Sequence, residues 1–197
     1  FKNFIIKFNS RRLINSVLGS LKISSEKQPG IIRILDKLEK IGRKSVIEEL
    51  SPLIDELSAN NLLDIVSIKG TTEDKLKLLD RYEIREIREF VTLARLFNIS
   101  ENNLFFDPSL ARGLDYYTGI IFEVFIPEVP IGAMCAGGRY DDLCSLFSPE
   151  QFSGVGVAFG FDRIVVAMEE LGLFIDLTLN SQALVTYFDL NTLPTSI

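Results

Sequence analysis

Residues 112–124 read RGLDYYTGIIFEV, and the expected fold is built outward from this stretch. An arginine, two adjacent tyrosines and two glycines come directly before an apolar run that is typical of a β-strand. Polar groups gathered at the start of a strand indicate a ligand pocket. Arg112 carries a planar fork of donors that matches carboxylate and phosphate, so we expect it to bind an anion. An ion pair between Arg112 and Asp115 is the alternative that these residues leave open.

Two further glycine-bearing clusters follow along the chain. Residues 135–142 read CAGGRYDD, where paired glycines either let a ligand approach the backbone or form a plain turn before a helix. Residues 153–163 read SGVGVAFGFDR, in which glycines alternate with apolar residues on a strand that opens a helix. The glycines lie on the strand, so this is no dinucleotide-binding fingerprint. A helix amino terminus with Arg163 in its first turn can still bind a phosphate.

The composition excludes several classes of chemistry. The chain has 197 residues, a formal net charge of -6 and no histidine. The charge argues against broad electrostatic binding to nucleic acid, and the missing histidine removes the commonest general base. Cys135 and Cys144 are too few for a disulfide framework or a metal site, which favours a reducing compartment. No apolar run approaches the roughly 18 residues that a membrane-spanning helix needs.

The first half of the chain is expected to be helical. A strand over residues 1–8 precedes a helix that reaches about Leu21 and begins at a cap in Asn9-Ser10. From residue 31 to residue 97 the apolar positions recur at helical spacing, and their charged outer faces are most simply solvated. A smaller set could instead face a nucleic acid: Arg33, Lys37, Lys40, Arg43 and Lys44. Breaks in this helical region are expected at Gly42, Pro52 and Gly70.

The second half is expected to be rich in strands. Short apolar runs bounded by Gly, Pro and Asp lie at residues 104–106, 120–126, 133–136 and 155–159. Their close spacing favours antiparallel pairing. A helix follows over residues 164–171, and a last strand over 183–189 would begin a truncated second domain. Tyr116 and Tyr117, if extended, would point to opposite faces, so only one would line a given pocket wall.

The three strings RGLDYYTGIIFEV, CAGGRYDDL and GVGVAFGFDRI resemble, in this order and spacing, two histidine-specific motifs and motif 3 of the histidyl-tRNA synthetase family. These proteins are class II aminoacyl-tRNA synthetases. The resemblance implies an α/β (α+β) fold in which an antiparallel sheet is flanked by helices and carries a helical insertion. Asp142 stands where the family often has glycine, and Phe161-Asp162 where Leu-Glu is common. Both departures are conservative.

The resemblance also implies an activity and a site. Histidine and ATP, with Mg²⁺ on the nucleotide, would form histidyl-adenylate, and the histidyl group would pass to tRNA(His) without a tightly bound cofactor or a protein-held metal. Arg112 would bind the α-phosphate and the substrate carboxylate. Arg163 would hold the γ-phosphate, with Gly160 beside the ATP. Tyr117 would meet the substrate imidazole. The rest of the histidine pocket would be shaped by Tyr116, Tyr140, Gly137 and Gly138.

The same resemblance divides the chain. Residues 1–28 and 71–176 would belong to the catalytic core, 29–70 to the helical insertion, and 177–197 to a linker and the start of an anticodon-binding domain. The insertion would face the tRNA acceptor arm. Nothing resembling motif 1 or motif 2 precedes Phe1, so we expect the isolated chain to be inactive. The full-length protein would be a cytoplasmic homodimer without a membrane partner.

Two other functions stay open. The regulatory subunit of ATP phosphoribosyltransferase is a non-catalytic paralogue that shares the fold and parts of both histidine motifs. The intact stretch from Arg112 to Tyr117 and the strand expected over 183–189 argue against it. A synthetase-like sensor domain that binds uncharged tRNA would be indicated by loss of Arg112 or Tyr117, and both are present.

Overall fold

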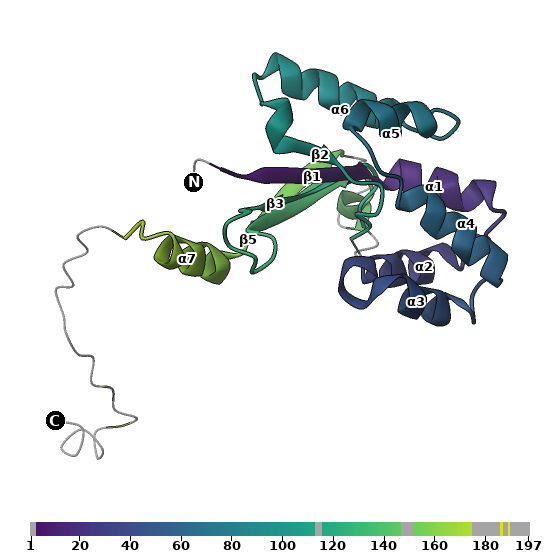
Figure 1. Cartoon of the computed structure of the whole chain (residues 1–197), viewed down its shortest axis with the longest axis horizontal. Helices are drawn as coiled ribbons and strands as arrows, with labels where there is room; N and C mark the ends of the chain where they lie inside the picture. Colours follow the sequence, from purple (N-terminus) through teal and green to yellow (C-terminus); the bar gives the residue numbers. More distant parts are fainter. Residues whose placement is uncertain (1–2, 113–115, 147–151, 175–185, 187–188, 190–197) are drawn as a thin grey trace.

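The computed structural model describes residues 3–112, 116–146 and 152–174, together with Thr186 and Asp189. At its centre lies a five-stranded sheet with the strand order β2-β1-β3-β4-β5 (Figure 1). The strands are β1 (Ile5–Ser10), β2 (Leu104–Phe106), β3 (Ile120–Phe125), β4 (Cys135–Tyr140) and β5 (Gly154–Phe159).

Antiparallel pairing, expected from the close spacing of the strands, is confirmed for three of the four strand pairs. β1 and β2 are parallel instead. Six helices lie between these two strands in the sequence, and a parallel pair needs such a long connection to return the chain in the same direction. In the antiparallel part, β3 pairs with β4 and β4 pairs with β5, so the three glycine-bearing clusters come to lie side by side.

The helical region consists of several separate helices that surround the sheet. In Figure 1, α5 and α6 run along one side of the sheet, α2 and α3 lie beyond one end, and α7 follows β5 at the other. Their bounds are α1 (Arg11–Ser20), α2 (Gln28–Leu35), α3 (Leu38–Leu50), α4 (Glu56–Val66), α5 (Thr72–Leu78), α6 (Arg85–Leu96) and α7 (Phe161–Glu170). Two short 3-10 turns are η1 (Glu101–Asn103) and η2 (Leu143–Leu146).

Local signals set the helix starts. The Ser10 hydroxyl accepts a hydrogen bond from the Arg12 amide at 3.2 Å, which caps α1 where the sequence predicts it. Thr71 and Asp74 cap each other's backbone amides and so begin α5.

Several boundaries differ from the sequence-based expectation: β1 begins at Ile5 and ends at Ser10, and α7 begins at Phe161. The single helix expected over residues 31–42 is divided between α2 and α3, and Gly42 has a φ of 76°, a left-handed value that interrupts helical geometry within α3. The strand expected over 133–136 begins at Cys135 and continues to Tyr140. The paired glycines therefore lie inside a strand and do not form a turn before a helix.

One hydrophobic core joins the sheet to the helices. Phe8 and Ile121 of the sheet belong to the same buried cluster as Ile31, Leu50 and Leu62 of α2, α3 and α4. Residues 29–70 thus share a core with the rest of the chain, and their boundaries as an insertion stay a prediction. A second, smaller cluster, formed by Ile126, Val129, Met134 and Ala167, packs α7 against the loop after β3.

Residues 183–189, expected to form a strand, lie outside the described part of the chain except for Thr186 and Asp189. Among the residues that the structure describes, no helix is long and apolar enough to cross a membrane.

Candidate functional site

An open cavity of about 590 Å³ lies over β3, β4 and β5 and brings the predicted anion-binding residues together. Arg112 enters it from the segment before β3, and Gly160 and Arg163 enter it from the start of α7. Its remaining walls come from β3, β4, β5 and the junction of α2 with α3. The lining residues that matter for the chemistry are Asp36, Lys40, Glu123 and Cys135.

Arg112 is held in an unusual conformation. Its φ is 42°, a left-handed value that is uncommon for a residue other than glycine and that occurs often at functional sites. Arg112 Nη1 donates to Glu123 Oε1 at 2.6 Å, and the Arg112 carbonyl accepts from Arg11 Nη2 at 2.9 Å. Arg112 Nε is buried and has no hydrogen-bond partner among the described residues. A buried donor without a partner costs free energy.

Glu123 is the carboxylate that orients Arg112. It lies on β3, opposite Lys7 of β1 and Ala136 of β4. Burial raises the pKa of Glu123 above its ordinary value, although the nearby Arg112 guanidinium lowers it, and Asp36 raises it further. Asp115, the partner that the sequence offered as an alternative, lies outside the described residues.

The three predicted tyrosines form one aromatic cluster. The ring centroids of Tyr116 and Tyr117 are 4.6 Å apart, and those of Tyr116 and Tyr140 are 6.1 Å apart in an edge-on arrangement. Tyr117 is 6% exposed, whereas Tyr116 is 39% exposed. Residues 116–119 are not in a strand, so the two neighbouring rings contact each other and do not point to opposite faces of an extended segment.

Tyr117 is also the link between the cluster and the anion cavity. Burial raises the pKa of Tyr117 to about 12, the neighbouring Tyr116 hydroxyl adds to this, and the Arg112 guanidinium acts in the opposite direction. The Tyr117 hydroxyl therefore stays protonated at neutral pH and can donate a hydrogen bond. On another side, Tyr117 borders a cavity of about 160 Å³ that is also lined by Arg11 and Gln28.

The predicted glycines make room for the tyrosines and for the sheet itself. A Cβ atom on Gly138 would lie 2.8 Å from the Tyr117 ring and 2.6 Å from the Ile120 carbonyl oxygen. A Cβ on Gly137 would lie 2.0 Å from the carbonyl oxygen of Gly156 on β5. Close approach requires glycine at both positions, and here the approaching groups are protein atoms.

Arg163 lies in the first turn of α7, as the sequence predicts. Its Nη1 donates to the Ala133 carbonyl at 3.0 Å, which fixes the guanidinium beside Gly132 at the mouth of the cavity. Gly160 precedes the helix, and its amide donates to the Met134 carbonyl at 2.8 Å. Arg112 and Arg163 thus face one cavity from two separate elements, an arrangement that suits a ligand with more than one anionic group.

Cys135 borders the cavity but has no feature of a nucleophile. It is a free cysteine, and burial raises the pKa of its thiol, which keeps it protonated at neutral pH.

The basic residues considered as a set on the helical segment have different surroundings, and their contact with a nucleic acid stays a prediction. Lys37 pairs with Glu49 at 2.7 Å, and Arg43 pairs with Asp64 at 2.8 Å. Lys40 instead lines the anion cavity beside Arg112 and Arg163.

Sequence reasoning missed Glu123 as the partner of Arg112. The available signal was a carboxylate inside the apolar run of residues 120–125, because a charge in a half-buried strand needs a partner. It also missed Glu86 on α6, described below, for which the sequence offered no local signal.

Comparison with known proteins shows the family to which the chain belongs. A family model described as histidyl-tRNA synthetase matches residues 1–164. The histidine–tRNA ligase of Treponema denticola is 39% identical over 183 residues, which cover 86% of this chain and 40% of that protein. The crystal structure of histidyl-tRNA synthetase from Nostoc sp. PCC 7120 superposes with a TM-score of 0.80 at 29% identity, covering 98% of this chain and 48% of that one.

A third protein shares the fold. The structure named as an ATP phosphoribosyltransferase regulatory subunit/histidyl-tRNA synthetase from Bacillus halodurans C has a TM-score of 0.60 at 19% identity, covering 98% of this chain and 57% of that one. At this identity the likeness concerns the fold alone.

The mostly antiparallel sheet with its flanking helices is therefore a fold found among aminoacyl-tRNA synthetases. More narrowly, the chain belongs to the histidyl-tRNA synthetase family. It spans about two fifths of the length of the Treponema denticola protein.

Proposed function

We propose that the full-length protein carrying this chain is a histidine–tRNA ligase of class II. It activates histidine with ATP, releases pyrophosphate, and transfers the histidyl group from histidyl-adenylate to tRNA(His). The supporting observation is the position of Arg112 between the anion cavity and the tyrosine cluster. For a histidine carboxylate to attack a nucleotide phosphate, histidine and ATP must meet. Arg112 lies where the tyrosine cluster adjoins the anion cavity.

In this proposal Arg112 binds the α-phosphate and the substrate carboxylate, with the buried Nε as a donor that lacks a partner among the described residues. Negative charge grows on the phosphate oxygens as the carboxylate attacks, and a preorganised guanidinium stabilises that charge. Loss of one such donor typically costs about 3 kcal/mol of transition-state stabilisation. No side chain has to remove a proton in this step, because the attacking carboxylate is already ionised.

Tyr117 contacts the imidazole of the substrate, and its protonated hydroxyl can donate to a neutral ring nitrogen. Tyr116 and Tyr140 complete the pocket wall, while Gly137 and Gly138 let the strands and the Tyr117 ring approach closely.

Arg163 and Gly160 bind the distal part of ATP, with Arg163 at the γ-phosphate. Among the described residues no group of three or more acidic or cysteine side chains could hold a metal ion. We propose that Mg²⁺ binds through the phosphates of the nucleotide, where it would neutralise charge on the leaving pyrophosphate. We propose further that the enzyme acts in the cytoplasm as a homodimer.

The test is histidine-dependent ATP–pyrophosphate exchange by the full-length protein, with Arg112→Ala measured beside it. We expect exchange by the unaltered protein and a loss on the order of 100-fold in the variant. Arg43→Ala serves as a matched control, since Arg43 is tied to Asp64 outside the cavity. Histidine binding without exchange would contradict the proposal and indicate the regulatory paralogue.

A further inference from the structure

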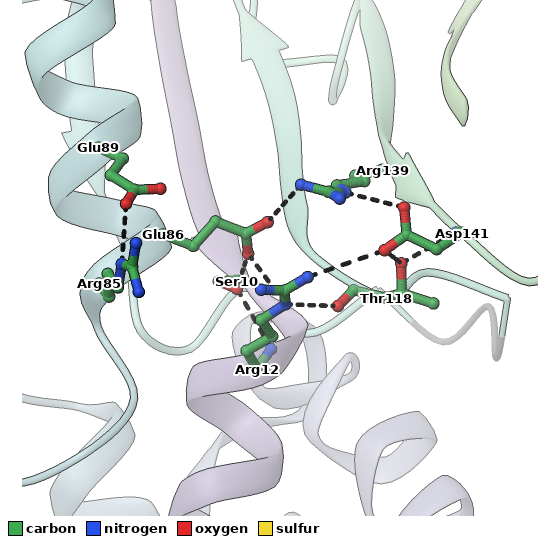
Figure 2. Close-up of polar contacts among 8 residues, drawn as sticks. All are labelled: Ser10, Arg12, Arg85, Glu86, Glu89, Thr118, Arg139 and Asp141. Carbon is green, nitrogen blue, oxygen red and sulfur yellow. Dashed lines mark hydrogen bonds and ion pairs between the residues drawn. The ribbon is translucent and has the colours of Figure 1, made fainter. Parts of the chain in front are cut away.

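A buried carboxylate on α6 lies at the centre of a polar network that reaches the histidine motifs (Figure 2). Glu86 is 9% exposed, and its Oε2 accepts a hydrogen bond from the Ser10 hydroxyl at 2.6 Å. Arg139 Nη1 lies 3.5 Å from Glu86 Oε1, and Arg12 Nε lies 3.9 Å from Oε2. Two arginines from β4 and α1 are thus held against one carboxylate.

The network continues to a second carboxylate, Asp141, just after β4. Asp141 accepts hydrogen bonds at 2.9 Å from Arg139 Nε and from the Thr118 hydroxyl. Burial alone would raise the pKa of Asp141, but hydrogen bonds from Arg139, Ser153 and Thr118 outweigh it and lower the pKa below its ordinary value. Asp141 is therefore ionised at neutral pH, and Arg139 bridges two carboxylates.

The network fixes the backbone that carries the tyrosine pair. Thr118 directly follows Tyr117, and its amide donates to the Arg139 carbonyl at 2.9 Å. Its hydroxyl also accepts from the Asp141 amide at 3.0 Å. Gly119 comes next, and a Cβ atom there would lie 2.4 Å from Glu86 Oε1. Glu86 therefore packs directly against the turn that leads from Tyr117 into β3.

From this arrangement we propose that Glu86 is a positioning residue for substrate histidine. It acts through Arg139, Ser10 and the close contact at Gly119 to hold Tyr116 and Tyr117 against the imidazole. Glu86 does not line the anion cavity, so it acts on the tyrosines and not on the nucleotide. This inference rests on the proposed function, because it concerns the same histidine pocket.

The charge of Glu86, more than its shape, is what the network uses. A glutamine has nearly the same size but cannot balance the two guanidinium groups. Arg139 would then keep Asp141 as its carboxylate partner, and the turn at residues 118–119 would pack against an uncharged side chain on α6.

The experiment compares Glu86→Gln with Glu89→Gln in the full-length protein. Glu89 lies one turn further along α6 and pairs with Arg85 at 2.9 Å on the exposed side of the helix, which makes it a matched control (Figure 2). We expect Glu86→Gln to raise KM for histidine at least about tenfold, with KM for ATP changed by less than about twofold. Glu89→Gln should change neither constant.

A second readout does not depend on activity. Tyr117 titrates at about 12 because of its burial and its contact with Tyr116. If Glu86 holds this pair, Glu86→Gln shifts the titration towards the ordinary tyrosine value of 10.0, measured by tyrosinate absorbance. Asp141→Asn removes the second carboxylate that binds Arg139, and it should give the same shift. This variant keeps the proposal testable if Glu86→Gln fails to fold.

The outcomes separate the two proposals. If the unaltered protein shows no histidine-dependent exchange, the proposed ligase function fails, and the proposed histidine-positioning role fails with it. In that case, a shift of the Tyr117 titration in the variants would support only a structural link from Glu86 to Tyr117, without a role in binding histidine. If exchange is present but Glu86→Gln raises KM for histidine and KM for ATP equally, the positioning role is wrong. It is also wrong if Glu86→Gln lowers the melting temperature but leaves both KM values and the Tyr117 titration unchanged.

Discussion

The backbone of Gly138 lies against the ring of Tyr117, so that a Cβ atom at residue 138 would approach the ring to 2.8 Å. The two residues come from different histidine motifs, and strand pairing between β3 and β4 brings them together. The position of the tyrosine that we propose to contact the substrate is thus set by the absence of a side chain on the neighbouring strand.

Gly138→Ala should displace the Tyr117 ring. Because the same Cβ would also lie 2.6 Å from the Ile120 carbonyl oxygen, the backbone cannot easily relieve the contact. We expect the free energy of unfolding to fall by about 1–3 kcal/mol, the usual cost of overpacking. KM for histidine should rise more than KM for ATP. Urea denaturation and pyrophosphate exchange measure these two effects.

Gly19→Ala is the control for this substitution. Gly19 lies in α1, and a Cβ there would meet no atom within 4 Å. An alanine in a helix is favoured over glycine by roughly 0.5–1 kcal/mol, so stability should be equal or higher. Equal kinetic constants for Gly138→Ala and the unaltered protein would contradict the proposed contact.

The raised pKa of Tyr117 predicts a pH dependence of stability. The folded state holds this proton up to a pH of about 12, whereas the unfolded chain releases it near 10.0. Between these values the unfolded state binds fewer protons, so the free energy of unfolding decreases as pH rises through this range. In Tyr117→Phe this part of the pH dependence should disappear, as measured by denaturation between pH 9 and pH 12. Tyr82→Phe should retain it.

Lys40 and Arg43 are expected to differ although they are neighbours in the sequence. Lys40 shares the cavity with Arg112 and Arg163, so Lys40→Ala should raise KM for ATP several-fold in pyrophosphate exchange. Arg43 forms an exposed pair with Asp64, and Arg43→Ala should cost no more than about 1 kcal/mol of stability and leave KM unchanged. An effect of Lys40→Ala on KM for tRNA alone would place Lys40 at the acceptor arm instead.

The isolated chain of residues 1–197 is expected to show no histidine-dependent pyrophosphate exchange. It covers 40% of the length of its Treponema denticola relative. The strand that borders the cavity, β5, exposes Val155, Val157 and Phe159 by 73%, 49% and 67%, so this side of the site is open to solvent. Circular dichroism should show that the chain is folded, and any exchange above background would contradict the prediction.

Local structure followed directly from the order of residues. The cap at Ser10 and the reciprocal cap of Thr71 and Asp74 act over two or three residues, through hydrogen bonds to the nearest backbone amides. The same holds for Arg163 in the first turn of α7. Such signals need no information about distant parts of the chain, which is why the cap of α1 and the place of Arg163 in the first turn of α7 were predicted correctly.

The pairing of elements could be predicted only in part. Antiparallel pairing of β3, β4 and β5 follows from short connections, whereas the parallel pair of β1 and β2 joins segments separated by six helices. No local pattern specifies which distant strand fills the edge beside β1.

The environment of the site was decided by tertiary packing. Arg112 pairs with Glu123 of β3, and Glu86 reaches Ser10 across 76 positions of sequence. Burial then sets the pKa of Glu123 and of Tyr117, since removal of water disfavours the charged form of each group. Residue types and spacing identified the candidate groups. Their partners, their protonation and their distances depend on contacts between residues far apart in the chain, which exist only in the folded protein.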